Sequence, residues 1–318
     1  MEVTLSVRRY DPEADRPESF YQDFKVEVDE AATVLDGLIK VREEIDGTLA
    51  LRCSCRSAIC GSCAMRVNGR GVLACNTKLV EFTSAGNGAV VVEPAGNMGL
   101  LKDLVVEFDV HWNKVRAIDP WLKPSGPPPE QEYIASEEDM LHLAGVMGCI
   151  QCGVCVSDCT VLEVDENFLG PAALAKAYRF VADPRDDAAI DRLGELNRYG
   201  GIWDCTRCMQ CVQVCPKGVD PMGRIMSMRE LAMEAGYMDN NGARHAAAFA
   251  DIVEHNGLLN EFWLTIKTFG MFNVPEMFKL APIGIKAFLR GKMPPVAFEK
   301  IPGADDVARI FERVEGRK

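Results

Sequence analysis

Two closely similar cysteine runs constrain this chain more than any other feature of its sequence. The run CTRCMQCVQVCPKG has the spacing C-x2-C-x2-C-x3-C followed by proline, and CIQCGVCVSDC repeats that spacing. Such paired runs are typical of proteins that hold two cubane iron–sulfur clusters, in which three neighbouring cysteines bind one cluster and the fourth binds the other. The predicted ligand sets are Cys149, Cys152, Cys155 with Cys215, and Cys205, Cys208, Cys211 with Cys159.

Structural zinc is the alternative interpretation of the same cysteines. Zinc takes four thiolates, usually as two separated pairs. Here three cysteines lie within one loop of each run and the fourth points elsewhere, which favours clusters. With zinc, the protein would be a non-catalytic scaffold, and assays of iron, sulfide and visible absorbance would distinguish the two.

A third cysteine group lies in the stretch CSCRSAICGSC. Its members have the spacing C-x4-C-x2-C with one more cysteine downstream, which is typical of plant-type [2Fe–2S] ferredoxins. They are Cys55, Cys60, Cys63 and Cys75. Gly61 and the small residues around it would let backbone N–H groups approach the sulfurs, and such hydrogen bonds help to set the reduction potential. Cys53 falls outside the motif and is expected to be an ordinary buried thiol.

Composition narrows the class of protein. At 318 residues, two domains are the natural expectation. A net charge of −12 argues against nucleic-acid binding. The chain begins MEVTLSVRRY, which reads as a strand and not as a secretory leader, so the clustered cysteines indicate metal binding in a reducing compartment. Since no apolar stretch approaches the roughly 20 residues needed to span a bilayer, we expect a soluble or peripheral protein.

The pattern up to residue 108 predicts a small domain of strands with one helix. The predicted strands are residues 3–8, 24–28, 49–52 and 90–93. Residues 65–73 predict a hairpin that turns at Asn68-Gly69, and residues 33–44 have helical spacing. Together with the plant-type loop, these elements predict an α+β domain of the β-grasp, ferredoxin-like kind over residues 1–108.

The next part of the chain predicts a linker and then helices. KPSGPPPE lies within a linker over residues 109–135, and Ser136 is an expected helix N-cap. Further helices are predicted over residues 171–181, over residues 187–197, and from Asp220 to near Gly236. These elements predict an all-α, bacterial-ferredoxin-like two-cluster domain over residues 136–238.

Residues 239–318 form a C-terminal extension of a different character. Residues 243–254 and 258–268 predict helices. From Phe262 to Lys300 the chain holds six basic residues against two acidic ones, among many large apolar side chains such as Met271, Phe272, Met277 and Phe278. In an acidic protein this composition predicts a partner surface, either lipid headgroups or another subunit, with folding back on its own domain as the alternative.

Taken together, the motifs resemble those of the iron–sulfur subunit of succinate dehydrogenase and fumarate reductase over residues 1–235. The segments that carry the resemblance are SCRSAICGSC with Cys75, LKDLVVEFD, CIQCGVC with Cys159, FLGPAALAKAYRFVADPRD and CTRCMQCVQVCPKG. A single ferredoxin motif would be weak support. A plant-type loop followed by two cubane runs, in this order, is specific.

The resemblance implies an electron-transfer subunit with no substrate site and no catalytic residues of its own. A FAD-containing flavoprotein would oxidise succinate or reduce fumarate, and electrons would pass through three clusters toward a quinone-reactive membrane-anchor or cysteine-rich subunit. It implies a peripheral location at the cytoplasmic face of the inner membrane. The histidines are expected to be ordinary surface or core residues: His111, His142, His245 and His255.

Three departures from the family pattern matter. Members of the family have a non-cysteine at the position of Cys208 and a [3Fe–4S] third cluster; four thiolates here favour a second [4Fe–4S] cluster, with [3Fe–4S] as the alternative. The family's quinone-pocket residues are replaced by the stretch TVLE, residues 160–163, and by Thr206, so we assign no quinone-binding residues.

The third departure is in the tail, where residues 245–261, HAAAFADIVEHNGLLNE, are similar to segments of heterodisulfide-reductase-type iron–sulfur subunits. Those subunits pair with a cysteine-rich partner, and atypical succinate dehydrogenases combine both features. The alternative function is therefore electron transfer in a heterodisulfide- or thiol-linked fumarate reductase, or in a related glycolate or glycerol-3-phosphate oxidoreductase. The N-terminal plant-type domain makes the glycolate and glycerol-3-phosphate systems less favoured.

Overall fold

The structure, a computed structural model, describes residues 1–83, 89–270, 273–297, 300–314 and 316. It divides into unit 1, Met1–Leu231, and unit 2, Ala232–Lys318. Met271 and Phe272, which the sequence analysis counted in the basic and apolar tail, lie outside the described residues, as does the side chain of Met277.

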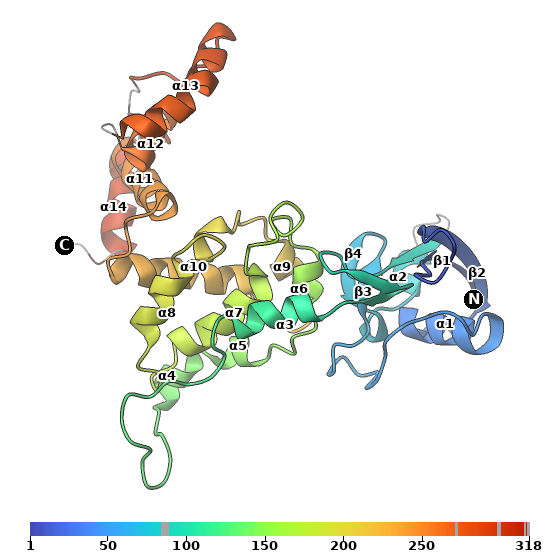
Figure 1. Cartoon of the computed structure of the whole chain (residues 1–318). Helices are drawn as coiled ribbons and strands as arrows, with labels where there is room; N and C mark the ends of the chain where they lie inside the picture. Colours follow the sequence, from blue (N-terminus) through green and yellow to red (C-terminus); the bar gives the residue numbers. More distant parts are fainter. Residues whose placement is uncertain (84–88, 271–272, 298–299, 315, 317–318) are drawn as a thin grey trace. The chain divides into compact units, whose positions relative to one another are not determined.

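Unit 1 begins with a five-stranded mixed sheet in the order β2-β1-β5-β3-β4 (Figure 1). The strands are β1 Glu2–Arg9, β2 Phe20–Glu27, β3 Ala64–Val67, β4 Arg70–Leu73 and β5 Val90–Glu93. β1 runs antiparallel to β2 and parallel to β5, and β3 pairs antiparallel with both β4 and β5. The β3–β4 hairpin turns at Asn68 and Gly69, both at positive φ, as the sequence predicts.

Helix α1, Val34–Lys40, covers the sheet. Thr33 caps it in a capping box with Asp36, and its buried face carries Leu35 and Leu38. Each fully buried leucine of this kind contributes about 1.5–3 kcal/mol through the hydrophobic effect. The helix ends in a wider π-helical turn, η1, Val41–Ile45, so the predicted helix over residues 33–44 is confirmed, with a changed last turn.

The predicted strand over residues 49–52 is wrong. This segment is irregular because side-chain hydrogen bonds replace a strand ladder: the buried Asp103 carboxylate accepts from the Ala50 N–H at 2.8 Å and from Arg9 Nε at 2.9 Å. Leu104 donates its N–H to the Ala50 carbonyl at 3.2 Å. Two short strands near Asp103, β6 Leu100–Lys102 and β7 Val105–Val106, pair with each other.

The rest of unit 1 is helical. Its elements are η2 Ala74–Asn76, α2 Val80–Thr83, α3 Asp109–Arg116, α4 Glu137–Leu141, α5 Ala144–Met147, α6 Val154–Ser157, α7 Gly170–Val181, α8 Ala189–Leu196, η3 Ile202–Asp204, α9 Gln210–Gln213 and α10 Pro221–Glu234. Helix α7, with Pro171 in its first turn, is buried along nearly its whole length. Helices α3, α5, α6 and α8 all pack against α7, which makes it the centre of this part (Figure 1).

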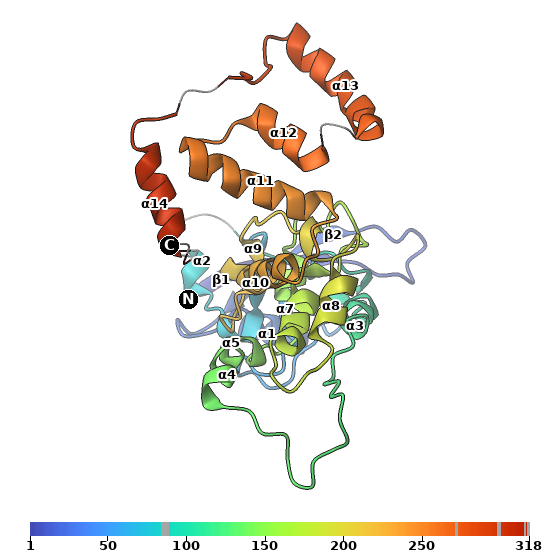
Figure 2. The ribbon, with the colours of Figure 1, turned by 90° about the vertical axis from the view of Figure 1, so that its left-hand side faces the viewer.

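Unit 2 consists of α11 Asn241–Asn256, α12 Glu261–Phe269, α13 Val274–Leu289 and α14 Ala304–Val314. Figure 2 shows α11 and α12 side by side, and α11 also packs against α14. The predicted helix over residues 258–268 starts later than expected because Asn260 is its N-cap. Among the described residues, no helix combines the length and the apolar character that crossing a membrane requires.

Candidate iron–sulfur sites

The β3–β4 hairpin brings the ends of the first cysteine group together. Cys63 directly precedes β3 and Cys75 follows β4, and the hairpin pairs Ala64 with Leu73. The Ala74 N–H then donates to the Cys63 carbonyl at 3.1 Å. The pairing of the hairpin therefore explains why a cysteine twelve residues downstream joins the loop that carries Cys55 and Cys60.

The loop between Cys55 and Cys63 turns its N–H groups toward sulfur. Cys55 Sγ accepts from the N–H groups of Ser57, Ile59 and Cys60 at 3.2–3.4 Å, and the Ala58 N–H donates to Cys75 Sγ at 3.3 Å. Arg56 and Ala58 reach this geometry in the left-handed region, at φ 54°. Hydrogen bonds of this kind stabilise negative charge on sulfur.

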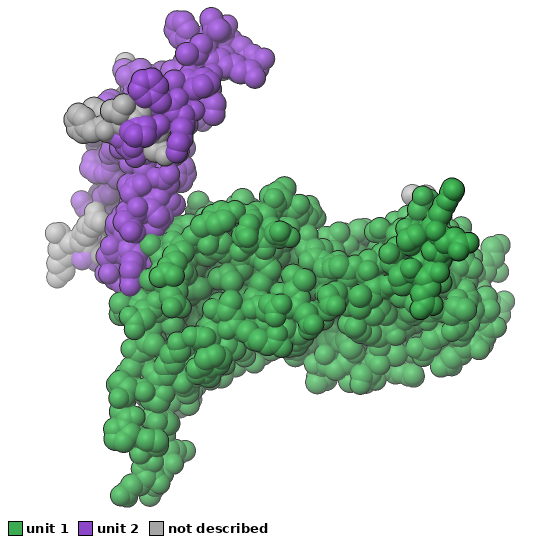
Figure 3. All heavy atoms as spheres, in the orientation of Figure 1, with its two compact units in different colours: residues 1–231 green, residues 232–318 purple. Residues whose placement is uncertain are grey.

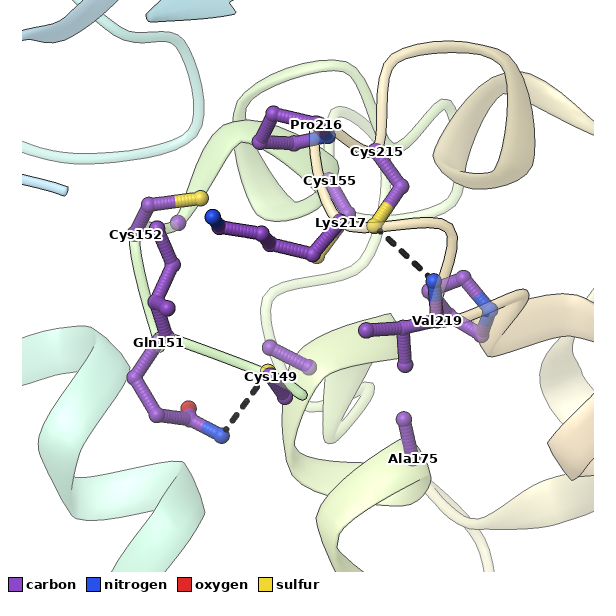
Figure 4. A pocket seen from close by; sticks show the side chains of 13 residues that line it. Cys149, Gln151, Cys152, Cys155, Ala175, Cys215, Pro216, Lys217 and Val219 are labelled. Carbon is purple, nitrogen blue, oxygen red and sulfur yellow. Dashed lines mark hydrogen bonds between the residues drawn. The ribbon is translucent and has the colours of Figure 1, made fainter. Parts of the chain in front are cut away.

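The second group surrounds a small enclosed cavity. Four cysteines line it, together with Ala172 and Ala175 of α7: Cys149, Cys152, Cys155 and Cys215. Figure 4 shows these side chains, with Gln151 Nε2 donating to Cys149 Sγ at 3.3 Å and the Val219 N–H donating to Cys215 Sγ at 3.4 Å. The small alanine side chains of α7 leave the space that the cysteines surround.

The third group surrounds a second enclosed cavity. Its cysteine lining is Cys159, Cys205, Cys208 and Cys211, with Phe168, Pro171 and Ile225 among the apolar neighbours. The Thr160 hydroxyl donates to Cys208 Sγ at 3.4 Å. Cys208 therefore lies with the other three, although it is exposed to solvent.

The two cubane runs repeat the same backbone geometry. In each run the residues on both sides of the second cysteine have positive φ: Gln151 and Gly153 in one, Arg207 and Met209 in the other. A short helix follows each, α6 after Gly153 and α9 after Met209. Three non-glycine residues thus adopt a conformation that L-residues rarely use, which is typical of a backbone shaped around a bound group.

Burial raises the pKa of several of these thiols and so favours their neutral form unless a cation is present. It raises the pKa of Cys63 and Cys211 to about 12, that of Cys152 to about 11, and that of Cys155 well above its usual value. In contrast, hydrogen bonding to Ser62 lowers the pKa of the exposed Cys60 to about 6. Ionised buried sulfurs in such groups need bound positive charge, which iron supplies.

Gly61 joins the first and second cysteine groups. It has φ +74°, and a Cβ placed on it would lie 2.7 Å from Cys152 Cβ and 2.8 Å from Cys152 Cα. Only a residue without a side chain allows this approach. The two ligand loops therefore touch through their backbones, a contact that sequence analysis did not identify.

Asp158 and Asn97 fix the α6 loop to the sheet. The buried Asp158 carboxylate accepts from the Gly71 N–H at 2.7 Å and from Arg66 Nε at 3.0 Å. Asn97 Nδ2 donates to the carbonyls of Val156 and Cys159 at 2.8 and 3.0 Å. These bonds hold α6 and the residues that follow it, and thus cysteines of two groups, against the β3–β4 hairpin and the loop after β5.

Two further polar residues lie close to the cysteines. Arg229 is buried, donates from Nη2 to the Cys205 carbonyl at 2.7 Å and from Nε to the Ile202 carbonyl at 2.8 Å, and lies over the Trp203 ring.

His111, expected to be an ordinary residue, is buried within hydrogen-bond distance of Gln151, and burial lowers its pKa to about 4. No motif marks either position. Cys53 is half-buried and packs on the core.

The donor chemistry fits clusters of several irons. Among the described residues, no three or more His, Cys, Asp or Glu side chains gather tightly enough to hold a single metal ion. The cubane-run cysteines instead line the walls of two cavities, with apolar side chains between them. Four thiolates spread around an enclosed space are what a cubane cluster requires.

Comparisons with known proteins agree with this chemistry. A family model described as a 2Fe-2S iron-sulfur cluster binding domain matches residues 4–113, and one described as a 4Fe-4S dicluster domain matches residues 145–219. The chain is 39% identical over 225 residues to the fumarate reductase iron-sulfur subunit of Mycobacterium tuberculosis (strain CDC 1551 / Oshkosh), which covers 70% of this chain and 90% of that protein.

Two further comparisons point the same way. The chain is 36% identical over 236 residues to the mitochondrial succinate dehydrogenase [ubiquinone] iron-sulfur subunit 1 of Oryza sativa subsp. japonica, which covers 73% of this chain and 83% of that protein. Among solved structures, a chain of the Mycobacterium smegmatis Sdh1 complex in the apo form matches with a TM-score of 0.61 and 28% identity. That match covers 74% of this chain and 97% of the other.

Proposed function

The chain belongs to the family of iron–sulfur subunits of succinate dehydrogenase and fumarate reductase, and from this membership we propose how its cysteines carry the electron-transfer function. The [2Fe–2S] cluster is held by Cys55, Cys60, Cys63 and Cys75. The first [4Fe–4S] cluster is held by Cys149, Cys152, Cys155 and Cys215. The third cluster is held by Cys159, Cys205, Cys208 and Cys211.

The observation that carries this function is the continuity of the three cysteine groups. Gly61 lies against Cys152, so the first group touches the second through backbone atoms. Cys155 and Cys159 lie one helical turn apart and line different cavities, so the second group touches the third. When bound, the clusters supply one-electron carriers; the chain holds them at short, fixed spacings in a medium of low dielectric constant.

We propose that the third cluster is [4Fe–4S] and not [3Fe–4S]. Cys208 lies with the other three cysteines. Burial raises the pKa of Cys208, but hydrogen bonds from the Thr160 hydroxyl and the Gln210 N–H outweigh this effect, so the pKa of Cys208 is lowered. EPR of the freshly purified, oxidised protein tests this. We expect no strong three-iron signal, and we expect one to emerge in Cys208→Ser. A strong three-iron signal in the unaltered protein would refute the assignment.

The fold assignments and boundaries follow from the same membership. The mixed sheet and α1 are assigned to a β-grasp domain over residues 1–108. Residues 109–135 are assigned to a linker, which begins with α3, a helix that packs against α7. Residues 136–238 are assigned to a bacterial-ferredoxin-like two-cluster domain, and residues 239–318 to an extension for partner or membrane contact. The matches at residues 4–113 and 145–219 support this division without fixing its ends.

The partners proposed for this chain are a FAD flavoprotein and a membrane-anchor or cysteine-rich, heterodisulfide-reductase-like subunit, at the cytoplasmic face of the inner membrane. Quinone would be reached through that second partner. Residues 160–163 and Thr206 stand where the family has its quinone contacts, and we assign none of them that role. The tail sequence, residues 245–261, supports the cysteine-rich type of partner.

Purification of the native complex tests the function. We expect a flavoprotein with covalently bound FAD to copurify, about ten iron atoms per copy of this chain, and succinate-dependent reduction of its clusters. The alternative, electron transfer in a thiol-linked fumarate reductase, predicts reduction by thiols and a cysteine-rich subunit. A preparation with zinc in place of iron, or without any flavoprotein, would contradict the proposal.

A further inference from the structure

Helix α13 exposes an apolar stripe that the rest of unit 2 does not cover. Phe278, Ile285 and Leu289 follow one another at seven and four residues and so lie on one face, with 74%, 61% and 77% of their surface exposed. Phe288, at 72%, widens the same face. Figure 3 shows unit 2 in purple. Whereas α11 packs against both α12 and α14, α13 has no comparable contact with another element of the described chain.

Hydrogen bonds to α12 hold the chain just before and just after α13. Before it, the Gly270 N–H closes α12 by donating to the Ile266 carbonyl at 2.9 Å. After it, the Val296 carbonyl accepts from Trp263 Nε1 at 3.0 Å. The segment thus begins at the C-terminal end of α12 and bonds back to α12 at Val296, and Figure 2 shows α13 lying beyond α12 on the side away from α11.

Such a helix needs a surface on which to bury its stripe. It contains Pro282, which removes one internal hydrogen bond and costs about 3 kcal/mol in a helix interior. Isolated helices shorter than about 12–15 residues are marginal in water, and α13, at 16 residues, is only slightly longer and is interrupted by Pro282. The face that would stabilise it is the apolar stripe.

Basic residues flank that stripe on one side. Lys279, Lys286 and Arg290 also follow at seven and four residues, each one position after a member of the apolar stripe, so they form a second stripe rotated by about 100°. Lys292 continues the positive charge beyond the helix. The whole chain has a net charge of −12, so this concentration of positive charge is local and opposite in sign.

The two family models do not include this element. The M. tuberculosis protein is matched over 90% of its length but covers only 70% of this chain, and the M. smegmatis chain is matched over 97% but covers 74%. This chain is therefore the longer one in both comparisons. Both family models end before unit 2 begins.

We propose that α13 is an interfacial helix that lies on an anionic lipid surface, with its apolar stripe among the acyl chains and its basic stripe at the headgroups. An apolar stripe bordered by lysine and arginine matches the layered polarity of such a surface. A protein groove bordered by acidic side chains would also match both stripes, and the variants and hydrogen exchange below distinguish that partner from lipid. The acidic remainder of the chain is repelled by the same lipids, so α13 also sets the orientation of contact.

Vesicle flotation with the full-length, cluster-loaded protein tests the proposal. We expect binding to vesicles of phosphatidylcholine with phosphatidylglycerol, weakening as salt is raised, and little binding to phosphatidylcholine alone. Equal binding to both vesicle types, or no binding to the anionic ones, would overturn the proposal.

Two matched pairs of variants locate the contact. The first pair removes three positive charges: Lys286→Gln with Arg290→Gln and Lys292→Gln, against Lys25→Gln with Arg116→Gln and Arg198→Gln elsewhere on the surface. We expect about a hundredfold weaker binding for the α13 set and little change for the control, which has the same net charge.

The second pair removes apolar groups of equal exposure. Ile285→Ser with Leu289→Ser changes side chains that are 61% and 77% exposed, and Ile310→Ser with Val314→Ser, in α14, changes side chains that are 61% and 80% exposed. Only the α13 pair should weaken binding, and visible spectra should show all clusters retained. Equal losses in both pairs, or protection of α13 from hydrogen exchange in the lipid-free complex, would overturn the proposal and favour a protein partner.

Discussion

Replacing Gly61 by alanine should separate the first cysteine group from the second. The new Cβ would lie 2.7 Å from Cys152 Cβ, where ordinary contacts are 3.4 Å or longer, so one of the two backbones must move. Gly69 offers a matched control. It also has positive φ, +78° against +74°, but has no atom within 4 Å of a Cβ.

The difference between the two variants isolates the contact. Both variants place an L-residue at positive φ, which lowers the free energy of unfolding by about 1 kcal/mol. Gly61→Ala adds an overpacking cost of about 1–3 kcal/mol, because the opposing atoms are backbone and Cβ atoms with no flexible end to move aside. For a unit of this size, about 3 °C of melting temperature corresponds to 1 kcal/mol. We therefore expect a fall of about 3 °C for Gly69→Ala and about 10 °C for Gly61→Ala.

Two measurements check this prediction. Thermal unfolding of the cluster-loaded protein gives the shift in melting temperature. The relaxation of the [2Fe–2S] EPR signal reports the distance to the neighbouring paramagnetic cluster, and we expect that coupling to weaken in Gly61→Ala alone. Equal melting shifts and unchanged relaxation in both variants would refute the close contact between the two loops.

Three further predictions follow from the same geometry. Asp158→Ala should lower the free energy of unfolding by about 3 kcal/mol, because it leaves the Gly71 N–H and Arg66 without their carboxylate. Glu163 is an exposed and more distant partner of Arg66, so Glu163→Ala should cost less than about 1 kcal/mol. The melting temperatures of the two variants check this difference. Burial opposes the ionisation of Asp183, but hydrogen bonds from Arg185 and Arg179 outweigh it and lower its pKa to about 2. That carboxylate therefore contributes about 2 kcal/mol to the free energy of unfolding above pH ~4, and this contribution is lost as the pH falls toward 2. The urea midpoints of the unaltered protein and of Asp183→Asn should therefore converge in acid. When a chelator removes iron, hydrogen-exchange protection should fall in α6, α7 and α9 earlier than in the sheet, because these helices supply residues lining the two cavities. An earlier loss of protection in the sheet would contradict this.

The cysteine groups could be predicted from the sequence because their chemistry is local. The spacing C-x2-C-x2-C places three sulfurs on one turn of chain, and the fourth cysteine follows a short helix that leads it to the other group. The hairpin turn at Asn68 and Gly69 was predictable for the same reason, since these residues readily adopt positive φ. The strand expected over residues 49–52 failed because a distant carboxylate, Asp103, takes its backbone partners.

The contacts between the groups could not be predicted, because they join residues far apart in sequence. Gly61 meets Cys152 across 91 positions, and Asp158 meets Gly71 across 87. Neither residue type by itself indicates a contact between distant segments, because glycine is common in turns of every kind and aspartate is common on surfaces. Arg229 is similar, because a buried arginine bonded to carbonyl groups leaves no pattern that separates it from an exposed one.

These long-range contacts hold the two halves of unit 1 together. Short-range spacing can build each cysteine group alone, but electron transfer depends on the separations between groups. Those separations are set by three kinds of contact: the backbone approach at Gly61, the hydrogen bonds of Asp158 and Asn97 that hold α6 on the hairpin, and the single turn between Cys155 and Cys159. The second of these fixes α6 and the residues after it, so a movement of the hairpin would carry cysteines of two groups with it. The spacing of the cysteine groups is therefore a property of the interface between sheet and helices, and substitutions there should change electron transfer while leaving every cysteine in place.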